Sequence, residues 1–208
     1  GGETAEMPGF YPDGEYDLAG YIVGVVEREN LLDGSKIRPG DVILGLSSAG
    51  LHTNGYSLAR KVFFDKAKLG MDARLDGLNG TLGEALMAPH RSYLKSVHPL
   101  VEEKAVNGLV HLTGGGFQGN IPRVLPEDCD AVIDRDTWEV PALFRHIMEL
   151  GEIERAEMDR AFNMGIGMLV FVSAERADEL AQRLADAGET VHRVGRVEKG
   201  TRSVQLLG

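Results

Sequence analysis

The sequence predicts an α/β (α+β) fold, a mixed sheet with helices packed mainly on one face. Short apolar runs rich in β-branched residues alternate with longer amphipathic runs along the 208 residues, which indicates strands alternating with helices. Two glycine-rich segments, 45–57 and 111–120, each stand where a strand should end and a helix begin. Hydrophobic residues make up 43% of the chain, which is enough for a packed core.

The first part of the chain predicts a domain boundary. Residues 1–15 are rich in glycine and proline and indicate a loop, whereas residues 16–27 form an apolar run typical of a strand buried on both faces. Residues 29–40 are polar and carry Asp-Gly and Pro-Gly turn signals. We therefore expect a remnant of an N-terminal domain over residues 1–30 and a C-terminal α/β domain over residues 37–208.

Each later element has its own local signal. Short apolar runs predict strands at 41–46, 109–113, 130–133 and 168–172. Amphipathic or capped segments predict helices at 56–68, 82–87, 89–103 with Pro89 in the first turn, a short turn from Asn120 stopped by Pro126, 141–150, 152–159, and 174–187 capped by Ser173. Residues 191–197 and 203–207 predict a terminal hairpin around Lys199 and Gly200.

Composition excludes several classes of function. The net charge is −10 and no basic run occurs, which argues against a nucleic-acid partner. A single cysteine, Cys129, allows no intrachain disulfide and fits a reducing compartment. No apolar run is long enough to cross a bilayer and no signal peptide is visible, so we expect a cytoplasmic protein without a membrane partner.

The first glycine-rich segment is a candidate anion site. A glycine loop at a helix N-terminus presents backbone N–H groups to a phosphate or a carbonyl oxygen, here from Asn54 and Gly55. His52 could donate a hydrogen bond or a proton, and Asn54 could orient a substrate amide or a metal-bound water. The alternative is a simple helix cap, with a histidine that only packs against the turn.

The second glycine-rich segment contains three consecutive glycines, more than a turn requires. Either another backbone or a ligand approaches there, and we favour a phosphorylated small molecule. A plain hinge is the alternative, and Phe117 could pack either on a nucleobase or in the core. The candidate binding residues of this segment are Thr113, Gly114, Gly115, Gly116, Phe117 and Asn120.

Two further positions complete the candidate site. Glu3 would serve as a Mg²⁺ ligand beside a nucleotide, because hard cations take carboxylate oxygens, although an acidic loop is usually just solvated. Asn163 precedes a strand together with Gly165 and Gly167, where a tight turn is the alternative reading. The histidines 90, 98, 146 and 192 show no metal-ligand spacing and receive no role.

Four motifs in order resemble the phosphoribosylformylglycinamidine cyclo-ligase (aminoimidazole ribonucleotide synthetase) family, from residue 1 to the C-terminus. They are the segments Gly1–Gly9, Gly50–Ser57, His111–Phe117 with Asn120–Pro126, and Phe162–Met168. The resemblance implies the C-terminal half of a two-domain synthetase, preceded by the last strand of a barrel-like N-terminal domain through which a homodimer forms.

The resemblance also implies the reaction. Formylglycinamidine ribonucleotide and ATP, with Mg²⁺, give aminoimidazole ribonucleotide, ADP and phosphate by way of an imidoyl phosphate, in de novo purine biosynthesis. His52 and Asn54 would be catalytic, Gly55, Asn163 and the second glycine segment would hold substrate or ATP phosphates, and Glu3 would bind the metal.

One departure matters. The family's N-terminal half carries a glycine-rich segment, a lysine and several aspartates for ATP and Mg²⁺, and none of these is in this chain. We therefore interpret the chain as a C-terminal portion that does not turn over ATP alone. The alternatives are another ATP-using member of the superfamily (formylglycinamidine synthase, selenophosphate synthetase or thiamine-monophosphate kinase) and a non-catalytic fragment.

Overall fold

A computed structural model describes residues 12, 14, 23–52 and 54–208 and divides the chain into two units, 1–31 and 32–208. Of the strand expected at 16–27, residues 16–22 lie outside the described residues, and residues 23–27 are neither strand nor helix. Within the described part of the first unit, a 3-10 turn at Arg28–Asn30 is the regular element. The assignment of residues 1–30 to a remnant of another domain remains a prediction.

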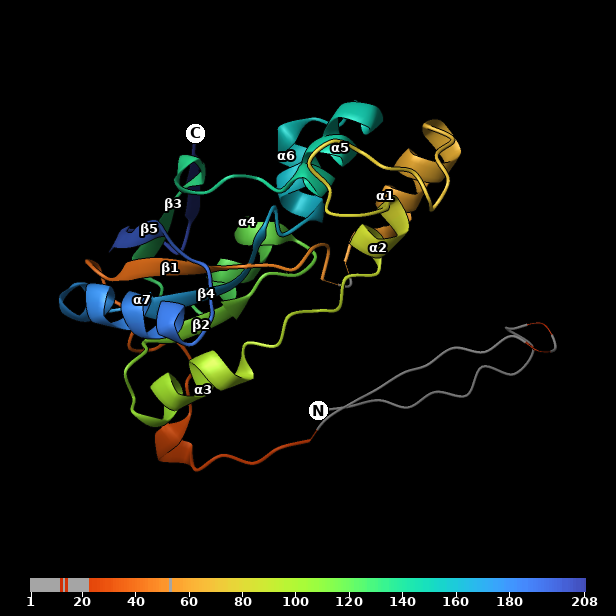
Figure 1. Ribbon diagram of the computed structural model, residues 1–208. Helices are drawn as coiled ribbons and strands as arrows, with labels where there is room; N and C mark the ends of the chain where they lie inside the picture. Colours follow the sequence, from red (N-terminus) through yellow and green to blue (C-terminus); the bar gives the residue numbers. More distant parts are fainter. Residues whose placement is uncertain (1–11, 13, 15–22, 53) are drawn as a thin grey trace. The chain divides into compact units, whose positions relative to one another are not determined.

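The second unit is built on a mixed sheet (Figure 1). Its strands, in the order in which they lie side by side, are β2 (Gly108–His111), β4 (Ile166–Val172), β1 (Val42–Ser47), β5 (Val191–Lys199), β3 (Cys129–Asp134) and β6 (Val204–Leu207). Neighbouring strands pair antiparallel except β3 and β6, which run parallel. The predicted α/β class with a mixed sheet is confirmed.

The prediction of a terminal hairpin is wrong. Strands β5 and β6 follow each other in sequence, but β3 lies between them and pairs with both. The chain leaves β5 through a turn that Asp130 holds, because its Oδ1 accepts from the N–H groups of Thr201 and Ser203 at 2.7 Å each. β6 therefore returns on the far side of β3.

Both faces of the sheet are covered. The long helices α3 (Leu94–Glu102) and α7 (Ala177–Asp186) pack on one face, as the sequence predicts, around buried side chains of β1 and β4. On the opposite face, α4 (Gly116–Asn120) and the 3-10 turn Ile121–Arg123 pack with Trp138 on a second cluster. The Asn120 turn was expected; its place on the other face was not.

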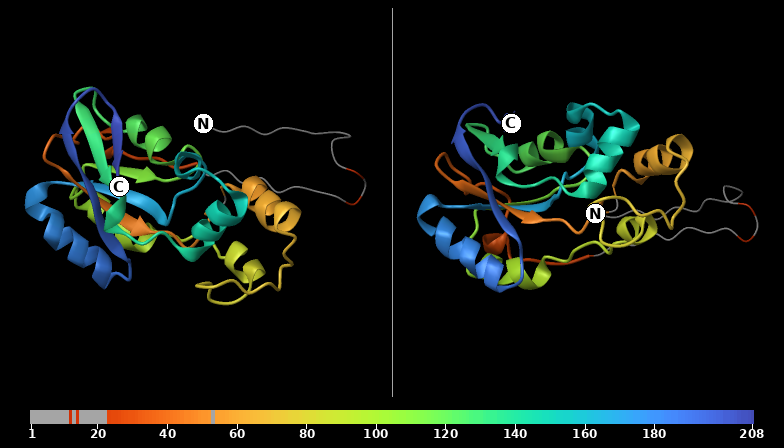
Figure 2. Two further views of the ribbon diagram at one scale, coloured as in Figure 1. Left: turned by 90° about the horizontal axis from the view of Figure 1, so that it is seen from above. Right: turned by 45° about the horizontal axis from the view of Figure 1, so that its top comes forward.

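A third apolar cluster joins helices at one end of the sheet (Figure 2). Its buried residues include Phe63, Phe144, Ile147, Met158 and Phe162. The helices that supply it are α1 (Tyr56–Arg60), continued as a π-helix over Lys61–Lys66, then α2 (Leu82–Leu86), α5 (Ala142–Gly151) and α6 (Arg155–Ala161).

Two helix starts differ from the predictions. The helix expected from Pro89 begins at Leu94, and the Arg91 N–H in the segment before it donates to the His52 side chain. The helix expected at 152–159 begins at Arg155, since Glu152 has a positive φ of 54° that ends α5. A 3-10 turn, Ala174–Arg176, precedes α7, and Ser173 makes no side-chain capping bond.

Candidate functional site

The two glycine segments meet at the same end of the sheet. β1 runs into the first, and β2 runs into the second just before α4. A Cβ built on Gly114 would find a single neighbour within contact distance, Asn54 Oδ1 at 3.6 Å. Asn54 is itself tied to the loop, because its Nδ2 donates to His52 O at 3.1 Å. The structure thus brings together Asn54 and Gly114, from the two predicted loops.

The three consecutive glycines, at positions 114–116, lie in different physical surroundings. Gly115 has φ +98°, a conformation that side chains disfavour. At Gly116 a Cβ would overlap the Asp159 carbonyl oxygen, so the main chains of α4 and α6 are in direct contact there. Only Gly114 is exposed and open, which makes it the glycine of the three where a ligand could approach.

Asn120 and Phe117 hold the second loop in place from its buried side. The Asn120 amide donates to three carbonyl oxygens, those of Thr113 (3.2 Å), Gly114 (3.3 Å) and Gly116 (2.8 Å). Phe117 is fully buried, with its ring centroid 5.7 Å from that of Trp138. These contacts favour core packing for Phe117 and loop support for Asn120; a role of either in ligand binding stays a prediction.

Asn163 ties its own turn to the first loop. Its Nδ2 donates to Gly50 O at 2.9 Å, and its Oδ1 accepts from Ser48 Oγ at 3.0 Å and Gly165 N at 2.8 Å. Gly55, at the start of α1, has φ +78° and leaves room for the Phe162 ring. The predicted motifs of this chain, apart from its first residues, therefore converge in space.

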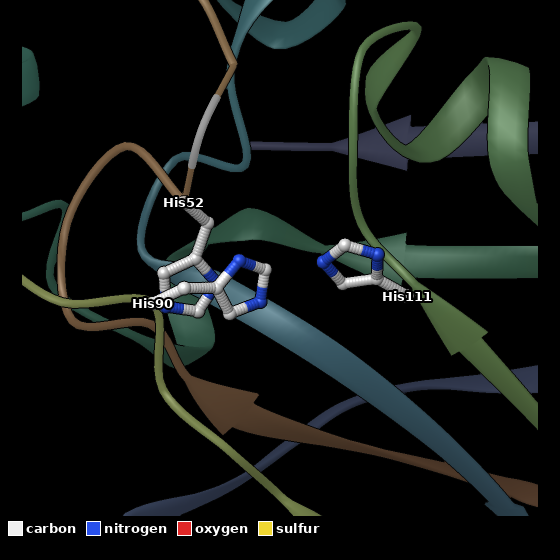
Figure 3. A group of neighbouring side chains, drawn as sticks. All are labelled: His52, His90 and His111. Atoms are coloured by element: carbon white, nitrogen blue, oxygen red, sulfur yellow. The ribbon is translucent and has the colours of Figure 1, made fainter. Parts of the chain in front are cut away.

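His52 is the buried member of a cluster of three imidazoles, with His90 and His111 (Figure 3). Its side chain is 2% exposed, and its Nε2 accepts from the N–H groups of Ala49 at 2.9 Å and Arg91 at 3.3 Å. The exposed His90 ring stacks on it with centroids 4.1 Å apart, and His111 lies 5.1 Å beyond His90. Sequence reasoning assigned His90 and Arg91 no role, and no local spacing reveals them.

The three imidazoles could hold a transition metal by distance alone, since one nitrogen from each lies within 4.8 Å of the others. The hydrogen bonds argue against it. A neutral ring whose Nε2 accepts hydrogen bonds carries its proton on Nδ1, so neither nitrogen of His52 offers an unused lone pair to a metal. Magnesium prefers oxygen ligands and does not fit this cluster. Glu3, the predicted magnesium ligand, lies outside the described residues.

Electrostatics keep His52 neutral. Burial first, and then the neighbouring His90, His111 and Arg91, together lower the pKa of His52 to about 4. The pKa of His111 is also lowered, first by burial and then by His90. Beside these rings lies an apolar cavity of ≈ 490 Å³, lined among others by Tyr93, Leu109 and Met168.

Two solved structures have a similar fold. Thiamine-monophosphate kinase from Stenotrophomonas maltophilia K279a has a TM-score of 0.59 and 16% identity, covering 87% of this chain and 54% of that one. The hydrogenase maturation protein HypE in complex with ATP has a TM-score of 0.50 and 18% identity, covering 83% and 49%. At this level of identity the likeness shows that the chain shares their fold.

Residues 38–206 match the C-terminal domain of AIR synthase related proteins, and the chain belongs to this family. A phosphoribosylformylglycinamidine cyclo-ligase from Syntrophus aciditrophicus (strain SB) is 50% identical over 96% of the chain, and one from Paraburkholderia phymatum is 53% identical over 96%. The chain spans 57% and 55% of these relatives, so it corresponds to a C-terminal portion. The resemblance inferred from the motifs is confirmed.

A search of the described residues for membrane-spanning helices finds none that is both long and apolar enough.

The surroundings of Gly116 and Gly119 predict opposite effects on stability when each of these two residues of α4 is replaced by alanine. Gly116→Ala should lower the free energy of unfolding by roughly 2 kcal/mol or more, because the new Cβ overlaps Asp159 O. Gly119→Ala is the matched control, since a Cβ there meets nothing within 4 Å and alanine favours helix. Urea unfolding measures both, and equal stabilities would contradict the packing argument.

The lowered pKa of His52 predicts an acid-sensitive contribution to stability. Its folded value of about 4 lies below the unfolded value, so the unfolded chain binds the proton more readily and stability falls as pH drops from about 6.5 towards 4. The loss should be at most about 3 kcal/mol. We expect His52→Gln to be less stable than wild type at about pH 7, with the difference shrinking towards about pH 4.5. Parallel pH profiles of the two unfolding free energies would refute the assignment.

Proposed function

We propose that the chain supplies the C-terminal domain of an enzyme that closes the imidazole ring of aminoimidazole ribonucleotide, using formylglycinamidine ribonucleotide and ATP. The observation that carries this proposal is the identity of about 50% with relatives named phosphoribosylformylglycinamidine cyclo-ligase, over nearly the whole chain. The thiamine-monophosphate kinase likeness is only 16% identical and supports the fold alone. Purine biosynthesis is the corresponding pathway.

The chemistry asks for orientation more than for a reactive side chain. ATP transfers its terminal phosphoryl group to the formamide oxygen, and ADP leaves. A nitrogen of the same molecule then attacks the activated carbon, the C–O bond to phosphate breaks, and the ring closes with loss of a proton. Holding the two reacting groups in line can lower the barrier by roughly 7–11 kcal/mol.

Asn54 and Gly114 are the residues that we place against the substrate. Both lie where the two glycine loops meet, Asn54 is half-buried and Gly114 is exposed with open space above its Cα. The Asn54 amide can donate to or accept from a carbonyl, amide or phosphate oxygen. Gly55 and Thr113, adjacent in the two loops, would complete a backbone cradle for a phosphate at the start of α1 and α4.

The nucleotide and its Mg²⁺ need groups beyond the described residues. Asp159, which packs behind α4, is already paired on both oxygens, with Arg135 at 2.6 Å and Arg155 at 3.0 Å, so its charge is balanced without a cation. We propose that Glu3, together with the part of the complete enzyme that this chain does not cover, supplies the metal ligands. A cytoplasmic homodimer formed through the N-terminal domain belongs to the same proposal.

The role of Asn54 predicts a kinetic effect in the complete enzyme. Asn54→Ala should lower kcat at least roughly tenfold with little change in melting temperature, because it removes one hydrogen-bonding group from the reacting region. Gln182→Ala, which removes an exposed side-chain amide from α7, is the matched control and should leave turnover unchanged. Equal kcat values for Asn54→Ala and wild type would remove Asn54 from the site.

The division of labour predicts the behaviour of the 208-residue chain alone. Because the groups we assign to ATP and Mg²⁺ lie largely outside it, the purified chain should release no ADP in response to substrate. Coupled detection of ADP, with and without formylglycinamidine ribonucleotide, measures this. Substrate-dependent ADP release above the no-enzyme background would overturn the proposed division.

A further inference from the structure

We propose that Arg91 and Glu189 are positioning residues, which hold the Arg91 main-chain amide against His52 and so fix this imidazole as its Nδ1–H tautomer. The catalytic meaning of the arrangement rests on the proposed function, whereas the tautomer itself does not. The inference also revises the role expected for His52, from proton transfer to a neutral imidazole that joins two loops.

The tautomer follows from the donors around His52. Backbone N–H groups can only donate, and two of them, from Ala49 and Arg91, point at the same ring nitrogen, Nε2. A nitrogen that accepts hydrogen bonds in this way carries no proton, so the proton of the neutral ring lies on Nδ1. The low pKa of His52 agrees, since the ring stays neutral near pH 7.

The Arg91 amide belongs to a segment 39 residues further along the chain than His52, so something must hold it in place. The Arg91 side chain does this from the other side. Its Nε donates to Glu189 Oε2 at 2.8 Å, and its Nη2 donates to Gly188 O at 2.7 Å. These contacts anchor the segment to the turn between α7 and β5.

Glu189 is itself fixed on both carboxylate oxygens. Its side chain is 4% exposed, and Oε1 accepts from Ser96 Oγ in α3 at 2.6 Å while Oε2 binds Arg91. We call the contacts of Arg91 with Glu189 and Gly188 the clamp. A buried carboxylate that loses a partner pays a desolvation penalty of several kcal/mol, so the clamp resists opening. The Ser96 hydroxyl also lies 3.1 Å from Tyr93 O, but its single proton is shared between this acceptor and the closer Glu189 Oε1.

The clamp also fixes the position of the two exposed imidazoles, His90 and His111. His90 immediately precedes Arg91 and stacks on His52, and His111 from the end of β2 lies next to His90 (Figure 3). A shift of the Arg91 backbone would therefore move His90 away from His52 and change the surface beside the second glycine loop. The pair of residues acts on the site through the main chain, without contacting a ligand.

Nitrogen-15 NMR of the histidine rings in the 208-residue chain tests the inference directly, because protonated and unprotonated ring nitrogens have well-separated shifts. In wild type at pH near 7 we expect His52 to show one protonated Nδ1 and one unprotonated Nε2. Arg91→Gln keeps the main-chain amide but removes the clamp, so the two shifts should move towards each other as the tautomers mix.

Two further variants keep the test decisive. Arg183→Gln breaks the exposed Arg183–Glu103 pair, which has similar distances of 2.7 and 2.8 Å but joins α7 to the end of α3, and should leave the wild-type pattern. Arg91→Gln with Glu189→Gln avoids an unpaired buried charge and should fold if the single variant does not.

The inference is overturned if wild-type His52 carries its proton on Nε2. It is equally overturned if the folded Arg91 variants keep the wild-type shifts. Neither readout depends on turnover, so failure of the proposed reaction would leave the tautomer result standing, and the reverse also holds.

Discussion

Close approach to the main chain at glycine positions is the constraint on which the rest of this structure depends. At Gly116 the backbone of α4 lies directly against the Asp159 carbonyl of α6, with no room for a Cβ. At Gly167 a Cβ would overlap the Tyr93 hydroxyl and come within 2.6 Å of His52 Cε1. Because these positions have no side chain, the glycine loops, the α3 segment and the histidines can pack into one small region at the end of the sheet.

Most polar side chains of that region serve to hold the loops. Asn120 spans three carbonyls of the second loop, Asn163 joins its turn to the first, and His52 accepts from two separate segments. Each of these groups is buried and hydrogen-bonded, as buried polar groups must be to avoid a desolvation cost. Among the described residues of this region, those that stay half-buried or exposed include Asn54, Gly55, Thr113, Gly114, His90 and His111.

Such a site suits a reaction whose nucleophile and electrophile belong to the same molecule. A rigid surface of backbone and amide groups can orient a flexible substrate, and fixed dipoles need no reorganisation when charge develops. The neutral His52 fits this picture, since a buried charge beneath the loops would cost stability. In the proposed enzyme, phosphoryl transfer would draw its cation and carboxylates from elsewhere, which agrees with a chain that spans little more than half of its relatives.

The sequence by itself determined the fold class and most of the strands, because hydrophobic periodicity, glycine and caps act over a few residues. The family was indicated by the resemblance of four motifs to a known family, not by these local patterns. Only the tertiary structure decided that β6 pairs with β3, that Phe117 lies in the core and that Arg91 reaches His52. These depend on contacts between residues far apart in the chain, for which no local pattern carries a signal. The same reason explains why Gly114 and Gly116, two residues apart in one run, have opposite surroundings.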